Sequence, residues 1–169
     1  QKNKKNYYDN KIQGKELSFN NMVDINSAFN CVNEFKEATS VIIKHNSPCG
    51  VASSTNIIDA YKKSIKDDPI SIFGGIIALN RQVDKKIAQL LTKNFYEVIV
   101  APNFTKDAKN IFLKKKNLRL IKTNNIKRDS KDDIFSINNS YLIQEKNDII
   151  FEKKYITQVS KYAASLKSI

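Results

Sequence analysis

Phe73-Gly74-Gly75-Ile76-Ile77-Ala78-Leu79 is a short apolar run that opens with two glycines, and its length and composition predict a buried β-strand. Asp84 follows it and is a residue type that caps helices, with Ile87 and Leu91 at helical spacing behind it. Residues 97–101, a glutamate followed by four apolar residues, predict the next strand. A strand, a helix and a strand in succession are typical of a parallel sheet covered by helices.

The alternation extends toward the amino terminus. Asp24 or Asn26 is predicted to cap a helix that continues to Phe35, and residues 40–43 are predicted to form a buried strand. A turn at Pro48-Cys49-Gly50 is expected to lead into a helix over 57–65. The helix is expected to stop at the next turn, which is Asp67-Asp68-Pro69.

The alternation also extends toward the carboxyl terminus. Thr105 is predicted to start a helix through Phe112, and residues 118–121 to form a strand. Beyond these the pattern predicts a solvated loop over 122–133, short strands over 135–137, 141–144 and 149–151, and a final helix over 156–166. The predicted fold class is therefore α/β, a three-layer α/β/α sandwich with a mainly parallel central sheet, in a single domain over residues 1–169.

The composition indicates a globular protein of the cytoplasm. Of the 169 residues, 41% are hydrophobic and 27% charged, which is enough apolar material for one core. No apolar run approaches the ~20 residues that cross a bilayer, and the amino terminus does not resemble a signal peptide, so no membrane association is expected. Cys31 and Cys49 are expected to be free thiols, with Cys31 on an apolar helical face.

The net charge of +12 raises the possibility of a nucleic-acid partner. Arginine, which is favoured for contacts to bases and phosphates, occurs only at Arg81, Arg119 and Arg128. The other basic residues are lysines spread along the chain, and lysine, asparagine and isoleucine are abundant together, as an A+T-rich coding sequence would produce. Runs such as Lys114-Lys115-Lys116 are interpreted as solvated faces, so no nucleic-acid partner is expected.

Lys44 and His45 stand together at the end of the apolar run 41–43. Histidine is the side chain best suited to accept a proton at neutral pH, and a neighbouring ammonium favours its neutral form. His45 is therefore a candidate general base. The alternative is a structural histidine at the end of a strand.

Other candidates lie near strand ends. Ligands of open parallel sheets bind beyond the carboxyl ends of the strands, and we expect the candidate residues to meet there on one rim. Gly74 and Gly75 have no side chain to keep a phosphate from the backbone N–H groups, although paired glycines also serve bulges and tight packing. Glu97 opens a strand and is able to accept from a substrate amide or hydroxyl, or else is an ordinary surface carboxylate.

Six blocks of sequence occur in the same order as in one family of enzymes. Together they cover about residues 11–121, and six ordered blocks are a specific signal. The blocks are Gly14-Lys15-Glu16-Leu17-Ser18-Phe19-Asn20-Asn21, Lys44-His45 with Pro48-Cys49-Gly50-Val51-Ala52, Asp67-Asp68-Pro69, Phe73-Gly74-Gly75-Ile76-Ile77-Ala78-Leu79-Asn80-Arg81, Val98-Ile99-Val100-Ala101-Pro102 and Lys114-Lys115-Lys116-Asn117-Leu118-Arg119-Leu120. The chain resembles the transformylase half of the bifunctional enzyme that combines AICAR transformylase with IMP cyclohydrolase.

The resemblance implies formyl transfer from 10-formyltetrahydrofolate, the co-substrate, to the 5-amino group of AICAR in purine synthesis, with no metal required. It implies catalytic roles for Lys44 and His45, the base removing the amine proton while the cation balances developing charge. It also implies that Asn20, Gly74 and Glu97 contact the nucleotide. The family position that matches Glu97 holds an aspartate, so the reach of the carboxylate differs.

The resemblance further implies a larger assembly. In the family the transformylase half consists of two cytidine-deaminase-like units, and this chain matches the first. An Arg-Tyr-Gly segment and the cyclohydrolase domain are expected before it, and a second unit after it. The paired glycines expected near residues 139–148 are absent here. The family's active site is completed across a homodimer, so the isolated 169 residues are expected to turn over little.

Three alternatives remain open. A zinc deaminase would have a related fold, but the chain has one histidine, no second cysteine three residues after Cys49 and no His-x-Glu. A basic nucleic-acid-binding module would account for the lysines. A catalytically silent remnant would bind AICAR without transferring a formyl group.

Overall fold

The computed structural model describes residues 6, 7, 9–123, 132–146, 157 and 162. Within the described residues the chain forms two compact units, residues 1–127 and 128–169, each of which is described by itself. The strand predicted over 149–151 lies outside the described residues, as does nearly all of the helix predicted over 156–166.

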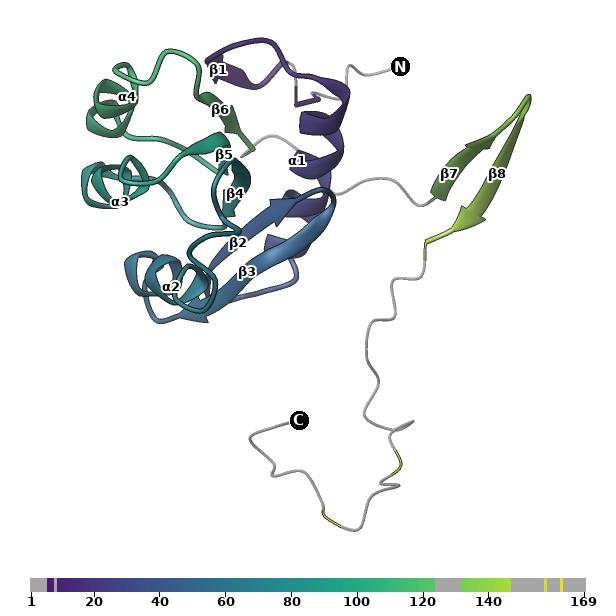
Figure 1. Cartoon of the computed structure of the whole chain (residues 1–169), viewed down its shortest axis with the longest axis horizontal. Coiled ribbons are helices and arrows are strands. Elements are labelled where there is room, and N and C mark those ends of the chain that lie inside the picture. Colours follow the sequence, from purple (N-terminus) through teal and green to yellow (C-terminus); the bar gives the residue numbers. More distant parts are fainter. Residues whose placement is uncertain (1–5, 8, 124–131, 147–156, 158–161, 163–169) are drawn as a thin grey trace. The chain divides into compact units, whose positions relative to one another are not determined.

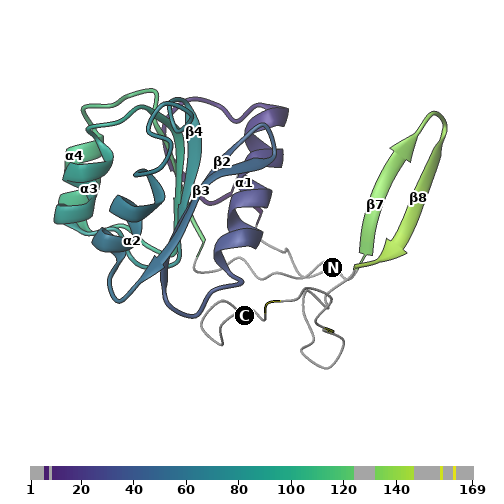
Figure 2. The ribbon, with the colours of Figure 1, turned by 60° about the horizontal axis from the view of Figure 1, so that its bottom comes forward.

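The first unit is built on a six-stranded sheet in the order β1-β6-β5-β4-β2-β3 (Figures 1 and 2). Its strands are β1 (Lys11–Gln13), β2 (Ala38–Lys44), β3 (Ser47–Ser54), β4 (Gly75–Leu79), β5 (Tyr96–Ala101) and β6 (Arg119–Lys122). Four strands, β3 to β6, share one direction, whereas β1 and β2 run against them. The predicted α/β class with a mostly parallel sheet is confirmed.

Four helices cover the two faces of this sheet. They are α1 (Phe19–Val32), α2 (Ile57–Ser64), α3 (Lys85–Leu91) and α4 (Lys106–Phe112). Figure 1 shows α1 on one face and the other three on the opposite face. Successive residues of β2 alternate between the two cores, with Val41 and Ile43 packed on the α1 side and Ile42 on the other, as the period of two in a strand requires. The three layers follow from strands that are apolar on both faces.

The helix caps on the α2–α4 face follow the predictions. Asp84 caps α3 by accepting from the Ile87 N–H at 3.0 Å, and Thr105 caps α4 by accepting from the Ala108 N–H at 3.2 Å. Each cap satisfies an N–H that has no partner inside the helix.

The predicted limits of α1 are wrong. The helix begins at Phe19, several residues before Asp24, and it ends at Val32 rather than reaching Phe35. Ser18 is the cap: its Oγ accepts from the Asn21 N–H at 3.1 Å, and the Asn21 side chain accepts from the Ser18 N–H at 3.2 Å. An asparagine thus fills the place that glutamate or glutamine usually takes in a capping box.

The predicted turn at Pro48-Cys49-Gly50 is also wrong, because these residues lie in β3. The chain reverses earlier, at His45 and Asn46. Proline is tolerated in β3 because it is an edge strand, and Cys49 is the extra residue of a β-bulge.

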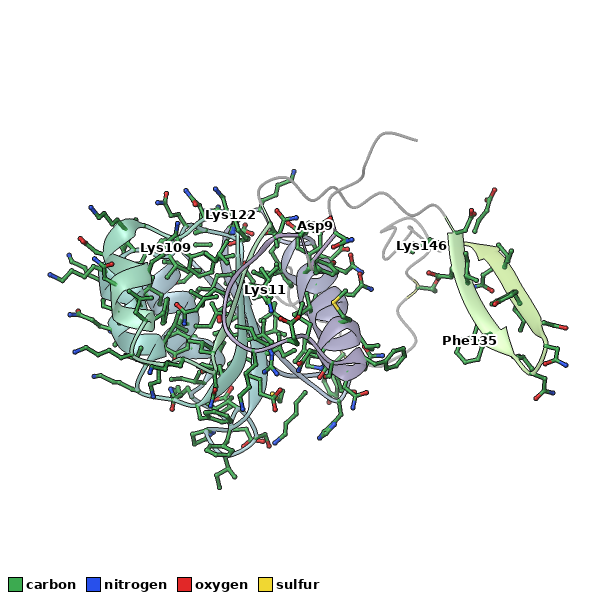
Figure 3. The ribbon with its side chains drawn as sticks, turned by 90° about the horizontal axis from the view of Figure 1, so that it is seen from above. Asp9, Lys11, Lys109, Lys122, Phe135 and Lys146 are labelled. Atoms are coloured by element: carbon green, nitrogen blue, oxygen red, sulfur yellow. The ribbon has the colours of Figure 1, made fainter. Side chains whose placement is uncertain are left out.

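The second unit contains the hairpin of β7 (Asp132–Ile137) and β8 (Ser140–Glu145), where two short strands are predicted. Its strands are antiparallel, and Asn138 in the turn has a positive φ of 49°. Large apolar side chains are exposed on the hairpin, and Phe135, at 67% exposure, projects from its strand in Figure 3.

None of the helices in the described part of the chain has both the length and the apolar character that crossing a membrane requires.

Candidate functional site

A two-residue turn carries the only histidine of the chain. His45 and Asn46 have φ values of 53° and 62°, the pair of positive angles that a type I′ hairpin turn requires. The Asn46 N–H donates to Asp24 Oδ1 at 2.7 Å, and the Asn46 side chain accepts from the Ser27 hydroxyl. Because Asp24 and Ser27 belong to α1, the turn is fastened to that helix while the His45 side chain stays exposed.

Lys44 is the last residue of β2 and is half-buried. Its Nζ donates to the carbonyl oxygen of Phe73 at 3.0 Å, just before Gly74. A lysine ammonium has three donors and the carbonyl uses one, so two donors remain for other partners. The geometry therefore sets a cation directly before the exposed histidine and beside the glycine pair.

Gly74 has a φ of 74°, a left-handed conformation that favours glycine. Its N–H donates to the Phe95 carbonyl at 2.9 Å, and the Gly75 N–H donates to the Ile72 carbonyl at 3.0 Å. Both N–H groups are engaged within the protein. The hypothesis that they approach a phosphate is therefore at odds with this structure.

Glu97 is aimed by a β-bulge at the start of β5. Gly75 pairs with Tyr96 and Ile76 pairs with Val98, so Glu97 is the extra residue between them. Tyr96 and Val98 then lie on opposite faces of the sheet, where regular alternation would put them on the same face. The bulge turns Glu97 toward α1, which regular alternation would not do.

Two side chains hold the Glu97 carboxylate. Asn21 Nδ2 donates to Glu97 Oε2 at 2.9 Å, and Arg119 Nη1 lies 3.7 Å from the same oxygen. Arg119 is itself fixed, because its Nε donates to the Glu16 carbonyl at 2.9 Å. The Glu97 side chain remains 43% exposed, so a ligand is able to reach it.

Asn20, a nucleotide contact according to the family resemblance, lies one residue away from this contact. It is exposed on the first turn of α1, and its side chain makes none of the hydrogen bonds found in the described part of the chain. The neighbouring Asn21 is buried and supplies both the cap contact and the Glu97 contact. The serine three residues before Asn21 is the signal that would have pointed to it.

The predicted site residues meet on one rim, but this rim is not at the carboxyl ends of the parallel strands. Gly74 precedes β4 and Glu97 lies at the start of β5, so both stand at amino ends. Lys44 joins them because β2 runs antiparallel to β4. The expectation fails because Gly74 and Glu97 stand where their strands begin, and only Lys44 stands where a strand ends.

A groove of about 610 Å³ adjoins the rim on the α3 and α4 side. Phe95, Glu97 and Arg119 contribute to its wall, whereas Lys44 and His45 do not. The Phe95 ring also contacts the Phe73 ring, with centroids 5.1 Å apart. Both rings are substantially exposed, at 49% and 64%, and the sequence reading did not single out this aromatic pair.

Cys49 lies behind the rim as a free thiol, as predicted for both cysteines. Its Sγ lies 3.6 Å from the Ile42 carbonyl oxygen and 3.8 Å from that of Ser71. Burial raises the pKa of the Cys49 thiol. Asp68 accepts from the Ser71 N–H at 2.9 Å, and the hydrogen bonds from Ser71 lower the pKa of this carboxyl.

Among the described residues, no group of three or more histidines, cysteines, aspartates or glutamates is placed to hold a metal ion.

Comparison with known proteins identifies relatives over most of the chain. The bifunctional purine biosynthesis protein PurH of Caldicellulosiruptor bescii is 51% identical over 140 residues, which are 82% of this chain and 27% of that protein. PurH of Thermoanaerobacter sp. is 44% identical over 158 residues, which are 94% of this chain and 31% of that protein. The chain thus spans less than a third of the length of these relatives.

A family model gives the same result. The model described as AICARFT/IMPCHase bienzyme matches residues 1–169. The resemblance drawn from the six sequence blocks is therefore confirmed. This match, together with relatives at 44% to 51% identity, establishes that the chain belongs to the AICARFT/IMPCHase bienzyme family.

Proposed function

We propose that this chain is part of an enzyme that transfers the formyl group of 10-formyltetrahydrofolate to the 5-amino group of AICAR, giving FAICAR and tetrahydrofolate for IMP synthesis. The proposal concerns the longer protein, because the chain spans less than a third of its relatives. Membership in the family supports it.

In this reaction the amine nitrogen attacks the formyl carbon and the bond from that carbon to N10 of the folate breaks. The amine loses one proton and N10 gains one, which gives FAICAR and tetrahydrofolate. We propose His45 as the base that takes the proton and Lys44 as the cation that balances charge on the transferred group. The consecutive placement of the two residues at the end of β2 supports these roles, as does the fastening of the turn to α1. A base must be held within hydrogen-bond reach of its proton, and an anchored turn provides that.

We propose that Asn20, Gly74 and Glu97 contact the nucleotide. The Glu97 carboxylate would accept from a hydroxyl or amide, and Asn21 and Arg119 would hold it in place. Gly74 would act through its small size, because its N–H is already donated to Phe95.

The remaining parts of the proposal concern the setting of the enzyme. We propose a cytoplasmic homodimer that takes two small-molecule substrates and needs no metal, no nucleic acid and no membrane. We also propose that residues 1–169 belong to one cytidine-deaminase-like domain of this enzyme.

The observation that carries the proposal is a pair of hydrogen bonds that connect the rim. Lys44 Nζ donates to the Phe73 carbonyl, and the Gly74 N–H donates to the carbonyl of Phe95, two residues before Glu97. The test is an assay of the full-length protein with AICAR and 10-formyltetrahydrofolate that follows FAICAR and tetrahydrofolate together. Formation of both at equal rates supports the proposal. AICAR binding without formyl transfer would select the silent remnant. One tightly held zinc per chain would select the deaminase, and duplex binding that weakens steeply with salt would select the nucleic-acid module.

A further inference from the structure

Behind the rim, three side chains share a buried hydrogen-bond network. Tyr61 of α2 and Tyr96, the first residue of β5, are 2% and 3% exposed. Their hydroxyl oxygens lie 3.2 Å apart, and Asn94 Nδ2 donates to the Tyr61 hydroxyl at 2.7 Å. Tyr61 is thus the residue that both of the others contact.

Two members of the network flank Phe95, the residue that hydrogen-bonds with Gly74 on the rim. Asn94 and Tyr96 flank Phe95, whose carbonyl accepts the Gly74 N–H at 2.9 Å, and the bulge residue Glu97 follows directly. A bulged strand end has lost regular ladder pairing at that point, so its conformation depends on contacts of this kind. Fixing residues 94–96 therefore fixes both the partner of Gly74 and the starting point of Glu97.

Tyr61 itself contributes no atom to the rim. It reaches the network from α2, which packs mainly on β2 and β3, and its own carbonyl accepts from the Ser64 hydroxyl at 2.9 Å. Burial and the neighbouring Tyr61 raise the pKa of Tyr96, so the Tyr96 hydroxyl stays protonated and able to donate a hydrogen bond at any physiological pH.

We infer that Tyr61 is a positioning residue for nucleotide binding, whose hydroxyl holds residues 94–97 in the conformation that presents Glu97 and Gly74 to the ligand. The inference rests on the proposed function for the identity of the nucleotide, AICAR. It assigns a role to a helix that none of the predicted site residues occupies.

The test compares two tyrosine-to-phenylalanine variants of the full-length protein. Tyr61→Phe removes the shared hydroxyl, whereas Tyr7→Phe removes a hydroxyl that donates to Asn26 Oδ1 at 3.2 Å, away from the network. Calorimetry is expected to show that Tyr61→Phe binds AICAR about fivefold more weakly or worse. This is the change in affinity that corresponds to the net contribution of about one hydrogen bond. Tyr7→Phe is expected to bind AICAR as the wild type does.

Kinetics separate positioning from general damage. Tyr61→Phe is expected to raise KM for AICAR while kcat stays within about twofold, because Glu97 would contact the nucleotide equally in the ground and transition states. Unchanged AICAR affinity in Tyr61→Phe, or an equal loss in Tyr7→Phe, would overturn the inference.

A second variant guards against misfolding of the first. Asn94→Ala removes the donor from a half-buried loop position and is expected to weaken AICAR binding as Tyr61→Phe does. Normal affinity in a folded Asn94→Ala would also count against the inference.

The proposed function fails on a different result. A wild type that binds AICAR but transfers no formyl group contradicts the reaction, and its affinity for AICAR still tests the role of Tyr61. A wild type that does not bind AICAR contradicts both.

Discussion

Asn21 Nδ2 donates a 2.9 Å hydrogen bond to Glu97 Oε2, so a buried amide on the first turn of α1 holds a carboxylate at the start of β5. The same side chain accepts from the Ser18 N–H and so closes the capping box. One residue therefore ties the start of the helix to the rim of the sheet. The site and the end of α1 are expected to respond together to its loss.

Asn21→Ala is expected to lower the free energy of unfolding by about 1–2 kcal/mol, because the variant loses a cap partner and leaves Glu97 with one fewer donor. Urea denaturation followed by circular dichroism measures this. The matched control is Asn20→Ala, which removes an exposed amide and is expected to change stability by less than about 0.5 kcal/mol. Equal losses in the two variants would contradict the role given to Asn21.

His45→Asn is expected to reduce formyl transfer by the full-length protein ~10²-fold or more while AICAR affinity changes little, because a general base acts in the transition state. Asparagine is the suitable replacement because it tolerates the positive φ of 53° better than alanine does, so the turn keeps its shape. Single-turnover rates and calorimetry measure the two quantities. Parallel losses in rate and affinity would rule out the base assignment.

The strands and most helices could be predicted because their signals are local. The run 75–79 is apolar throughout, and Asp84 and Thr105 cap helices through contacts three residues away. The turn at His45 was not predicted, because positive φ at a histidine is uncommon and Pro48 drew the prediction to the wrong place.

The site was only partly predictable for a different reason. Recognisable chemistry or a family match pointed to Lys44, His45, Gly74 and Glu97. The role of Asn21 depends instead on its hydrogen bond to Glu97, which is 76 residues away in the sequence. The direction of Glu97 depends on a bulge whose register is set by pairing with β4. Such long-range pairing leaves no local pattern in the sequence.

Two glycine variants are expected to differ in stability. Gly74→Ala meets no close atom and is strained only by its φ of 74°, which is expected to cost about 1–2 kcal/mol. Gly14→Ala has a φ of 96° and its added Cβ would also overlap the Leu118 carbonyl, so a larger loss is expected. Urea denaturation of both variants measures the order, and a Gly74→Ala variant at least as unstable as Gly14→Ala would be inconsistent with this geometry.

Cys49 is expected to react slowly with iodoacetamide, since the thiolate is the nucleophile and burial raises the pKa of this thiol. A raised pKa means that less thiolate is present at pH 8. The alkylation rate should therefore reach its plateau at a higher pH than for the same cysteine in the urea-unfolded chain.

The Asp68 carboxylate also raises the pKa of Cys49, so Asp68→Asn should speed alkylation of Cys49 modestly at pH 8. Cys31 is the internal control, because its pKa is raised by burial and by Glu34 and does not depend on Asp68. Mass spectrometry of the alkylated peptides resolves the two sites; a pH profile that is the same in the folded and unfolded chains would show that burial does not control the reactivity of Cys49.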